Sequence, residues 1–235
     1  MTTSRKISIY LEVGRRRTFA AALDWPGWCR SGKDEAEAVA ALVEAGPRYQ
    51  RALRSARLEF EAPASVAELT IRQRVPGTAT TDFGAPDQPV RGDTRPLTPA
   101  GVRRLQAILR ACWKAFDQAA RKAEGKSLRK GPRGGGRDLD AIRRHVLEAE
   151  AAYLARVGHR PDVGGGDTTA GLRAVRRASL VALADVAPLG QPPAGPRGGQ
   201  RWSALRFARR AAWHVLDHAW EIEDRINSPS PARDT

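Results

Sequence analysis

Two histidines near the C-terminus lie four residues apart in the stretch RWSALRFARRAAWHVLDHAWEIEDRI, residues 201–226. Side chains at this spacing lie on one face of a helix, so His214 and His218 can reach a common point. The apolar residues of the stretch recur at steps of three and four, which favours a helix over a strand. Two imidazoles beside that apolar stripe need a shared proton, a polar partner or a metal, because burying an unpaired polar group is costly.

A third histidine, His145, lies at the margin of an apolar stripe on another predicted helix. In a helical bundle its ring could converge with those of His214 and His218. Three imidazoles that leave one position open match the ligand set of a catalytic metal rather than of a closed structural site. A pair of histidines at this spacing, taken alone, is more often an ordinary pair on a helix face. His159 lies in a Gly-rich loop, and we expect it to be solvated.

Three carboxylates are spaced to support these histidines. A ligating imidazole usually donates its other N–H to a carboxylate or a carbonyl. Glu148 follows His145 by three residues, Glu221 follows His218 by three, and Asp217 lies three residues after His214. The sequence therefore predicts Glu148, Asp217 and Glu221 as acid–base residues or as residues that orient the imidazoles. An alternative is that each is solvated and pairs with a nearby arginine, such as Arg225 for Glu221.

The elements that must position these side chains are helices in the second half of the chain. Thr98 followed by Pro99 is typical of a helix start, and Asp138 lies near the start of the next helix. Gly-rich and Pro-rich loops separate the helices. Amphipathic helices with such connections predict a four-helix bundle, in which inward-facing side chains build the site. The predicted helices span residues 98–124, 138–157, 168–186 and 201–226.

The first 75 residues predict a different kind of unit. Two strand-like runs separated by GRRR indicate a hairpin, and a helix follows with Asp34 as its N-cap and Pro47 near its end. The predicted order is β-β-α-β-β, so the fold class of the chain is α+β. The predicted strands span residues 7–13, 18–23, 58–61 and 69–75. The predicted organisation is an α+β domain at 1–75, a linker at 76–96, a helical bundle at 97–226 and a disordered tail at 227–235.

Within the first unit, Pro26-Gly27-Trp28-Cys29, then Gly32-Lys33-Asp34-Glu35-Ala36-Glu37-Ala38, resembles the PGC-x-x-G-x-T-x-E-E-A pattern of HicB-like domains. The resemblance covers residues 7–55. It implies a small sheet with one helix across it, a fold that binds a toxin in antitoxins and is often followed by a DNA-binding module. No helix-turn-helix pattern follows here, so we interpret the unit as a docking or lid module. Residues 82–84 lie in the predicted linker; an alternative, less favoured than a plain spacer, is that they are ordered against one of the two domains near the site.

The second half resembles the DinB/YfiT-like bundle superfamily over residues 97–226. The resemblance rests on IRRHVLEAE, which contains His145, and on the downstream WHVLDHAWEIEDR, which contains the pair. It implies that His145, His214 and His218 are ligands of one divalent metal, with zinc, nickel or iron as candidates. It also implies a metal-dependent enzyme that carries out thiol-dependent transfer or isomerisation, with a thiol such as mycothiol, or hydrolysis of a small-molecule substrate.

The composition limits the remaining function classes. The net charge of +14 could indicate a nucleic-acid partner, but the basic residues are scattered and no basic strand interleaved with aromatic residues is present. Nucleic-acid binding is therefore disfavoured, although not excluded. No run is apolar enough for a membrane span, and two cysteines do not make a disulfide framework, so a cytoplasmic location is expected. A homo-oligomer is left open. The competing function is a non-enzymatic protein that binds a protein or a nucleic acid through the HicB-like module.

Other side chains are weaker candidates for a functional role. Trp113, Trp202, Trp213 and Trp220 could line a substrate pocket, although core or inter-domain packing is the more common use of tryptophan in a small bundle. Cys112 is interpreted as a core residue. The basic loop at 126–137 could hold an anion or could be solvated.

Overall fold

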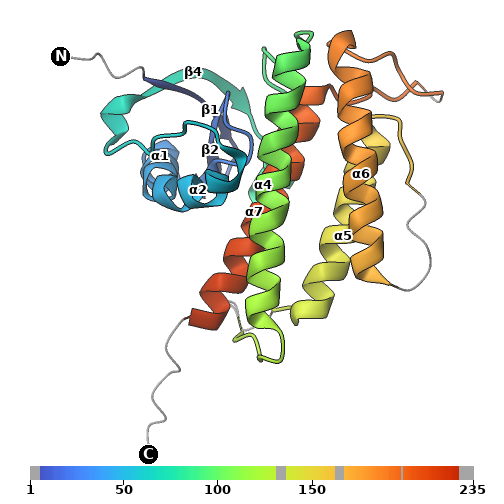
Figure 1. Cartoon of the computed structure of the whole chain (residues 1–235). Helices are drawn as coiled ribbons and strands as arrows, with labels where there is room; N and C mark the ends of the chain where they lie inside the picture. Colours follow the sequence, from blue (N-terminus) through green and yellow to red (C-terminus); the bar gives the residue numbers. More distant parts are fainter. Residues whose placement is uncertain (1–5, 131–135, 162–166, 197, 228–235) are drawn as a thin grey trace, which may run out of the picture.

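The computed structural model describes residues 6–130, 136–161, 167–196 and 198–227. Within them, a four-stranded sheet with two helices forms the N-terminal part, and four long helices follow (Figure 1). The prediction of an α+β chain with a small sheet unit first and helices after it is confirmed. The predicted disordered tail comprises residues 227–235. Asn227 is the last residue of a helix, and residues 228–235 lie outside the described residues.

The sheet has the strand order β3-β2-β1-β4. β1 and β2 pair antiparallel, as expected for the predicted hairpin. β4 pairs with β1 in parallel, and a parallel pair needs a long crossover, which here contains the helices α1 and α2. The elements are β1 (Ile7–Val13), β2 (Thr18–Ala22), β3 (Cys29–Gly32), α1 (Glu35–Glu44), α2 (Gly46–Leu53) and β4 (Leu69–Pro76).

The predicted order of this unit was wrong at two strands. β3 pairs with β2, but its sequence CRSG lacks the apolar alternation that identifies a half-buried strand. Residues 58–61 form no strand. Instead Phe60 is buried in an aromatic cluster, with its ring centroid 4.9–5.0 Å from those of Trp25, Trp28 and Tyr49. The apolar pattern of 58–61 therefore reflects packing rather than strand pairing.

The helical crossover follows the local sequence closely. The Asp34 side chain accepts a hydrogen bond from the backbone N–H of Glu37, which confirms the predicted N-cap of α1. Pro47 lies in the first turn of α2, where its missing N–H costs no helical hydrogen bond. The proline thus begins a second helix immediately after α1 ends at Glu44.

The central strands of the sheet are covered on both faces. Side chains alternate along β1, so Ile9 and Leu11 belong to the main core with Leu42 of α1. Tyr10, on the opposite face, belongs to a second cluster that includes Trp213 of α7 (Ala204–Asn227). Figure 1 shows α1 and α2 beside the strands, and the long helices next to this unit. The strands β1 and β2 therefore lie inside the molecule, whereas β4 is partly exposed.

Residues 77–96, which we call the strap, run from the sheet to the bundle and contain the short helix α3 (Ala79–Phe83). The fully buried Glu12 carboxylate of β1 accepts hydrogen bonds from Thr81 Oγ1 and from the backbone N–H groups of Asp87 and Gln88. At the other end, buried Asp93 pairs with Arg209. These contacts hold the strap against both parts of the chain. Phe83 itself is largely exposed.

Four long helices form the second half: α4 (Pro99–Ala123), α5 (Leu139–Arg156), α6 (Thr168–Val186) and α7 (Ala204–Asn227). Thr98, Asp138 and Asp167 cap the first three by accepting hydrogen bonds from backbone N–H groups. The helices lie side by side, with α4 and α7 next to the sheet unit and α5 and α6 farther from it (Figure 1). Their inward side chains belong to the same core cluster as Ile9 and Leu42.

The sheet unit is joined to α7 by close backbone approach and by charge. Gly27 has a φ of +97°, and a Cβ there would lie 3.0–3.1 Å from Leu216 and Ala212. The turn therefore requires glycine for its conformation and for space. Arg48 of α2 binds Glu223 at 2.7 Å and Asp224 at 2.8 Å, which adds ion pairs to this contact.

Among the described residues, no helix has both the length and the apolar character of a membrane span.

Candidate metal centre

The side chains of His145, His214 and His218 meet between α5 and α7. Their ligating atoms all lie within 4.8 Å of one another, and Nε2 of His145 is 3.2 Å from Nε2 of His214. The ring centroids are 4.6 to 5.1 Å apart. His214 and His218 are buried, and His145 is half-buried. This group of three histidines, called the histidine cluster below, could hold a metal ion.

Local sequence accounts for half of this geometry. His214 and His218 share a face of α7 because they are four residues apart. His145 is two turns into α5, whose start is fixed by the Asp138 cap. The contact between α5 and α7 brings the rings together, and it depends on the packing of apolar side chains such as Val146 and Val215, both fully buried.

His218 has an ordered partner for its second nitrogen. Its Nδ1 lies 2.7 Å from Oε2 of Glu221, and Oε1 of Glu221 accepts a hydrogen bond from Arg225 Nη1 at 2.9 Å. Arg225 also donates through Nε to the backbone carbonyl of Arg129. These contacts fix the orientation of the His218 ring and leave its Nε2 atom available to bind a ligand. Burial opposes ionisation of Glu221, but the hydrogen bonds and charges of His218 and Arg225 outweigh it and lower the pKa of this carboxyl.

His214 has no such partner. Its Nδ1 is buried and has no hydrogen-bond partner among the described residues, while Nε2 faces His145. Burial, followed by the proximity of His218 and His145, lowers the pKa of His214 well below its usual range. Burial and the same kind of repulsion lower the pKa of His145. Both rings are therefore neutral at pH 7, which is the form that binds metals.

The separation of the His145 and His214 Nε2 atoms suits a shared first-row metal ion. Two nitrogens at 2.0–2.1 Å from a tetrahedral zinc ion lie about 3.3 Å apart, close to the separation seen for His145 and His214. Three imidazoles without a carboxylate ligand suit zinc, nickel or iron better than magnesium or calcium, which prefer oxygen. The donor set is compatible with the predicted metals.

The three predicted carboxylates have different surroundings. Glu221 contacts His218 directly. Asp217 is exposed and pairs with Arg30 of β3 at 3.2 Å, so its side chain is directed to the sheet unit. Glu148 is exposed and makes no hydrogen bond or ion pair with the described residues. The structure therefore brings Glu221, and neither Glu148 nor Asp217, into contact with a histidine of the cluster.

The other candidate residues lie away from the cluster or line its surroundings. His159 is outside it and lies 3.6 Å from Asp185. Cys112 is fully buried in the core, and burial raises the pKa of its thiol. Trp220 lies under the guanidinium of Arg30 at the contact with the sheet unit. The predicted anion loop at 126–137 includes residues 131–135, which lie outside the described residues.

One neighbour of the cluster, Tyr153, is not identified by the sequence. Its ring lies edge-on to that of His214, with centroids 5.6 Å apart, and it stacks on Trp202. The Arg210 guanidinium lies 5.3 Å from the Tyr153 ring centroid. Tyr153 continues the apolar stripe of its helix, and no local pattern separates a tyrosine in a core from a tyrosine beside a site.

Comparison with known proteins gives no assignment: no family model, curated protein or solved structure matches this chain. The geometry of the described residues is therefore the basis for any function.

Proposed function

We propose that the chain is a metal-dependent enzyme of the DinB/YfiT-like type, with a HicB-like module packed against the bundle. The observation that carries the proposal is the convergence of His145, His214 and His218 from two helices onto one point. The lowered pKa values of His145 and His214 support it, because they favour the neutral rings that bind metals.

In this proposal His145, His214 and His218 hold one divalent ion, zinc, nickel or iron. A bound ion with an open position would lower the pKa of a water or a thiol and so supply a nucleophile at pH 7. Glu221 keeps the proton of His218 on Nδ1 and fixes the ring, and Arg225 holds Glu221 in place. The proposed reactions are thiol-dependent transfer or isomerisation, with a thiol such as mycothiol, and hydrolysis of a small molecule.

The competing proposal, a binding protein that uses the HicB-like module, has less support. The central strands β1 and β2 are buried between α1 on one face and Trp213 of α7 on the other, so these two strands are not open to a partner. We therefore propose that the HicB-like module packs against the bundle and does not bind a partner through the faces of these two strands.

Metal analysis of the purified chain tests the proposal. We expect about one equivalent of bound metal in the wild type, and its loss in His214→Ala. His159→Ala is the matched control, because His159 lies outside the cluster, and it should keep the metal. Metal retained in His214→Ala, or absent from wild type reconstituted with zinc, nickel and iron(II) in turn, would contradict a three-histidine centre.

Activity is tested separately with the metal-loaded chain. Consumption of an electrophile in the presence of mycothiol, compared with hydrolysis of ester and amide substrates without thiol, separates the proposed reactions. We expect turnover in His159→Ala and none in His214→Ala. Equal turnover in both variants would contradict an enzyme that depends on this centre.

A further inference from the structure

A surface groove of about 600 Å³ lies between the β1–β2 turn and the first part of the strap. The turn contributes Arg15 and Arg16, and the strap contributes residues 77–79, Asp82 and Phe83. Volumes of a few hundred Å³ are typical of ligand sites. Arg16 and Asp82 are 66 residues apart in the sequence, so the groove exists only in the folded chain.

Both sides of the groove are fixed in place. The backbone N–H of Arg16 donates to Oδ1 of Asp82 at 2.8 Å, which joins the turn to α3. Thr81 of α3 donates to the buried carboxylate of Glu12 in β1. A ligand therefore meets an ordered surface and loses little free energy in fixing it.

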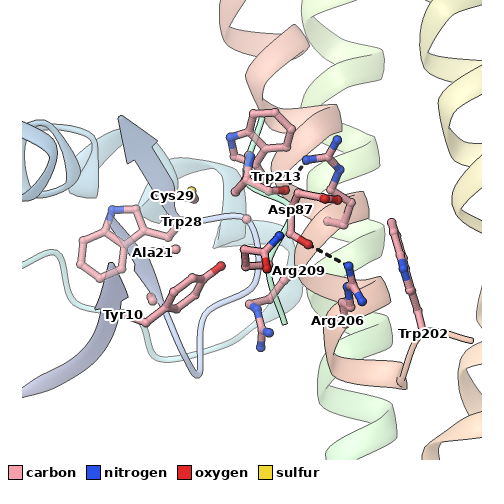
Figure 2. A pocket seen from close by; sticks show the side chains of 14 residues that line it. Tyr10, Ala21, Trp28, Cys29, Asp87, Trp202, Arg206, Arg209 and Trp213 are labelled. Atoms are coloured by element: carbon pink, nitrogen blue, oxygen red, sulfur yellow. Dashed lines mark hydrogen bonds between the residues drawn. The ribbon is translucent and has the colours of Figure 1, made fainter. Parts of the chain in front are cut away.

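The strap is also fixed beyond the groove, where it contacts α7. Arg206 of α7 donates to the backbone carbonyl of Asp87 at 2.8 Å (Figure 2). The space between the strap, the sheet and α7 measures only about 30 Å³, which is room for a water or two. Side chains fill this contact and leave no room for a ligand, whereas the groove beside Phe83 is open.

The Phe83 side chain is 87% exposed, although α3 holds its backbone in place. Among the described residues, no ring or guanidinium packs on it. Gly77 and Ala79, which line the groove with it, have little or no side chain, so the space beside the ring stays free. An ordered and uncovered aromatic ring is a surface on which a nucleobase can stack.

A single exposed apolar side chain is common on protein surfaces, so the charge beside Phe83 decides the chemistry of the groove. Arg15 and Arg16 are exposed, and in the part of the chain that the structure describes neither has a carboxylate within ion-pair distance. Arg17 follows them and donates to Ser31. A guanidinium binds a phosphate through two parallel N–H groups, so the groove favours phosphate ligands.

Phosphate-binding groups beside a free ring favour a single strand of nucleic acid. Each nucleotide supplies one phosphate and one flat base, and in a duplex the base faces are already stacked on one another. The net charge of +14 adds a general attraction for a polyanion. Asp82 favours RNA over DNA, because its Oδ2 has no partner among the described residues and can accept a hydrogen bond from a ribose 2′-hydroxyl.

We propose that this groove binds single-stranded RNA, with phosphates on Arg15 and Arg16 and a base on the ring of Phe83. The sequence disfavoured nucleic-acid binding because no aromatic residue is interleaved with a basic run. The fold supplies the missing ring from a distant segment. The groove is separate from the histidine cluster, so the proposal goes beyond the metal-dependent reaction.

Fluorescence anisotropy of the full chain with a labelled twelve-nucleotide oligouridylate tests the proposal. We expect saturable binding that weakens as the salt concentration rises. Phe83→Leu should weaken binding about fivefold or more, because it removes the flat ring and keeps an apolar side chain. Phe83→Tyr keeps the ring and should bind as the wild type does. Equal binding of Phe83→Leu and wild type, or no saturable binding, would overturn the proposal.

A pair of double variants separates a local site from diffuse attraction. Arg15→Gln with Arg16→Gln should reduce the slope of log affinity against log salt by about 1.4, because two fewer counterions are released from the strand. Arg173→Gln with Arg177→Gln removes the same charge from exposed positions of α6 and should leave the slope unchanged. Equal changes in the two double variants would mean that the net charge alone attracts RNA. Circular dichroism establishes that each variant is folded.

Three comparison ligands identify the partner. The matched oligodeoxyuridylate should bind about threefold more weakly or less, because it lacks the 2′-hydroxyl that Asp82 accepts. Binding of a duplex RNA of the same length should not change in Phe83→Leu. A twelve-residue polyglutamate peptide should not displace the oligouridylate at equal concentration. Displacement by the peptide would assign the groove to an acidic protein segment, and equal binding of the deoxy strand would contradict an RNA site.

Discussion

The helix α5 contributes to two buried polar clusters of the bundle. In the histidine cluster, His145 meets His214 and His218. In the other, which we call the Glu150 cluster, Glu150 accepts a hydrogen bond from Trp113 Nε1 at 2.8 Å and lies 3.4 Å from Arg176 Nε. Arg176 in turn forms two hydrogen bonds with Asp117.

The two clusters differ in how their charge is met. The Glu150 cluster contains opposite charges, so an acidic and a basic side chain compensate each other within the core. The histidine cluster contains three rings of one type, two of them with a lowered pKa. Both clusters keep buried atoms without a hydrogen-bond partner among the described residues: His214 Nδ1 in one, and Glu150 Oε2, Arg176 Nε and Arg176 Nη2 in the other. The comparison indicates that the Glu150 cluster balances its charge with its own members, whereas the three ring nitrogens that face one another are suited to receive a metal ion.

The largest effect is expected from breaking the Glu150 cluster. Glu150→Ala should lower the free energy of unfolding by about 3 kcal/mol, because it leaves the buried Arg176 beside an empty space. Denaturant unfolding measures the change. Glu148→Ala, at an exposed position of the same helix, is the control and should change stability little. Equal stability of both variants would mean that the Glu150 cluster is not a structural element.

The next effect concerns metal affinity. Glu221→Gln should weaken metal binding about tenfold or more, because the substitution removes the charge that holds His218 through Nδ1. Competition with a chromophoric chelator measures the affinity. Glu148→Gln should weaken metal binding much less, because the Glu148 charge acts on His145 without a hydrogen bond to it. If the two variants behave alike, Glu221 does not support the centre.

A pH titration sharpens the comparison. Burial raises the pKa of Glu150 above its unfolded value, and Arg176 only partly opposes this. The folded state therefore holds this proton more tightly, so the contribution to stability is full below pH 4.5 and is lost as the pH rises through the folded pKa. Relative to Glu150→Gln, the wild type should gain stability as the pH falls, by about 1.4 kcal/mol for a tenfold tighter hold on the proton. Unfolding of both proteins at pH 4 to 7 measures it, and a gain at high pH would contradict it.

The smallest effect is expected from the histidine cluster without metal. His214→Leu should change the free energy of unfolding of the metal-free chain by less than about 1 kcal/mol, because it removes an unpaired buried nitrogen and keeps a similar volume. Thermal unfolding in chelator tests this. A loss of several kcal/mol would show that the cluster is a structural network like that of Glu150 and would remove the contrast between them.

The sequence predicted the four long helices well because their signals are local, but it missed α2 as a separate helix and placed α3 in a linker. Capping residues such as Thr98 and Asp138, the proline at position 99 and the apolar stripes fix where the chain becomes helical. The same local rule placed His214 and His218 on one face. It failed for β3, whose four residues pair with β2 without an apolar pattern, and for Phe60, whose burial is aromatic packing.

The surroundings of the site required the tertiary structure. Glu148 and Glu221 have the same spacing from a histidine, yet Glu221 contacts its histidine and Glu148 is exposed. Asp217 pairs with Arg30, 187 residues away in the sequence. Because these partners lie on different elements, spacing along one helix cannot identify them.

The sequence by itself determined the four long helices, the sheet-then-helices order and the shared helix face of His214 and His218, because each depends on residues close to one another along the chain. Tertiary structure decided which face of α5 meets α7, which side of the sheet α7 covers and which ring lies beside the arginines of the β1–β2 turn. The physical reason is that these choices follow from burying apolar surface across the whole chain, a sum that no single segment contains.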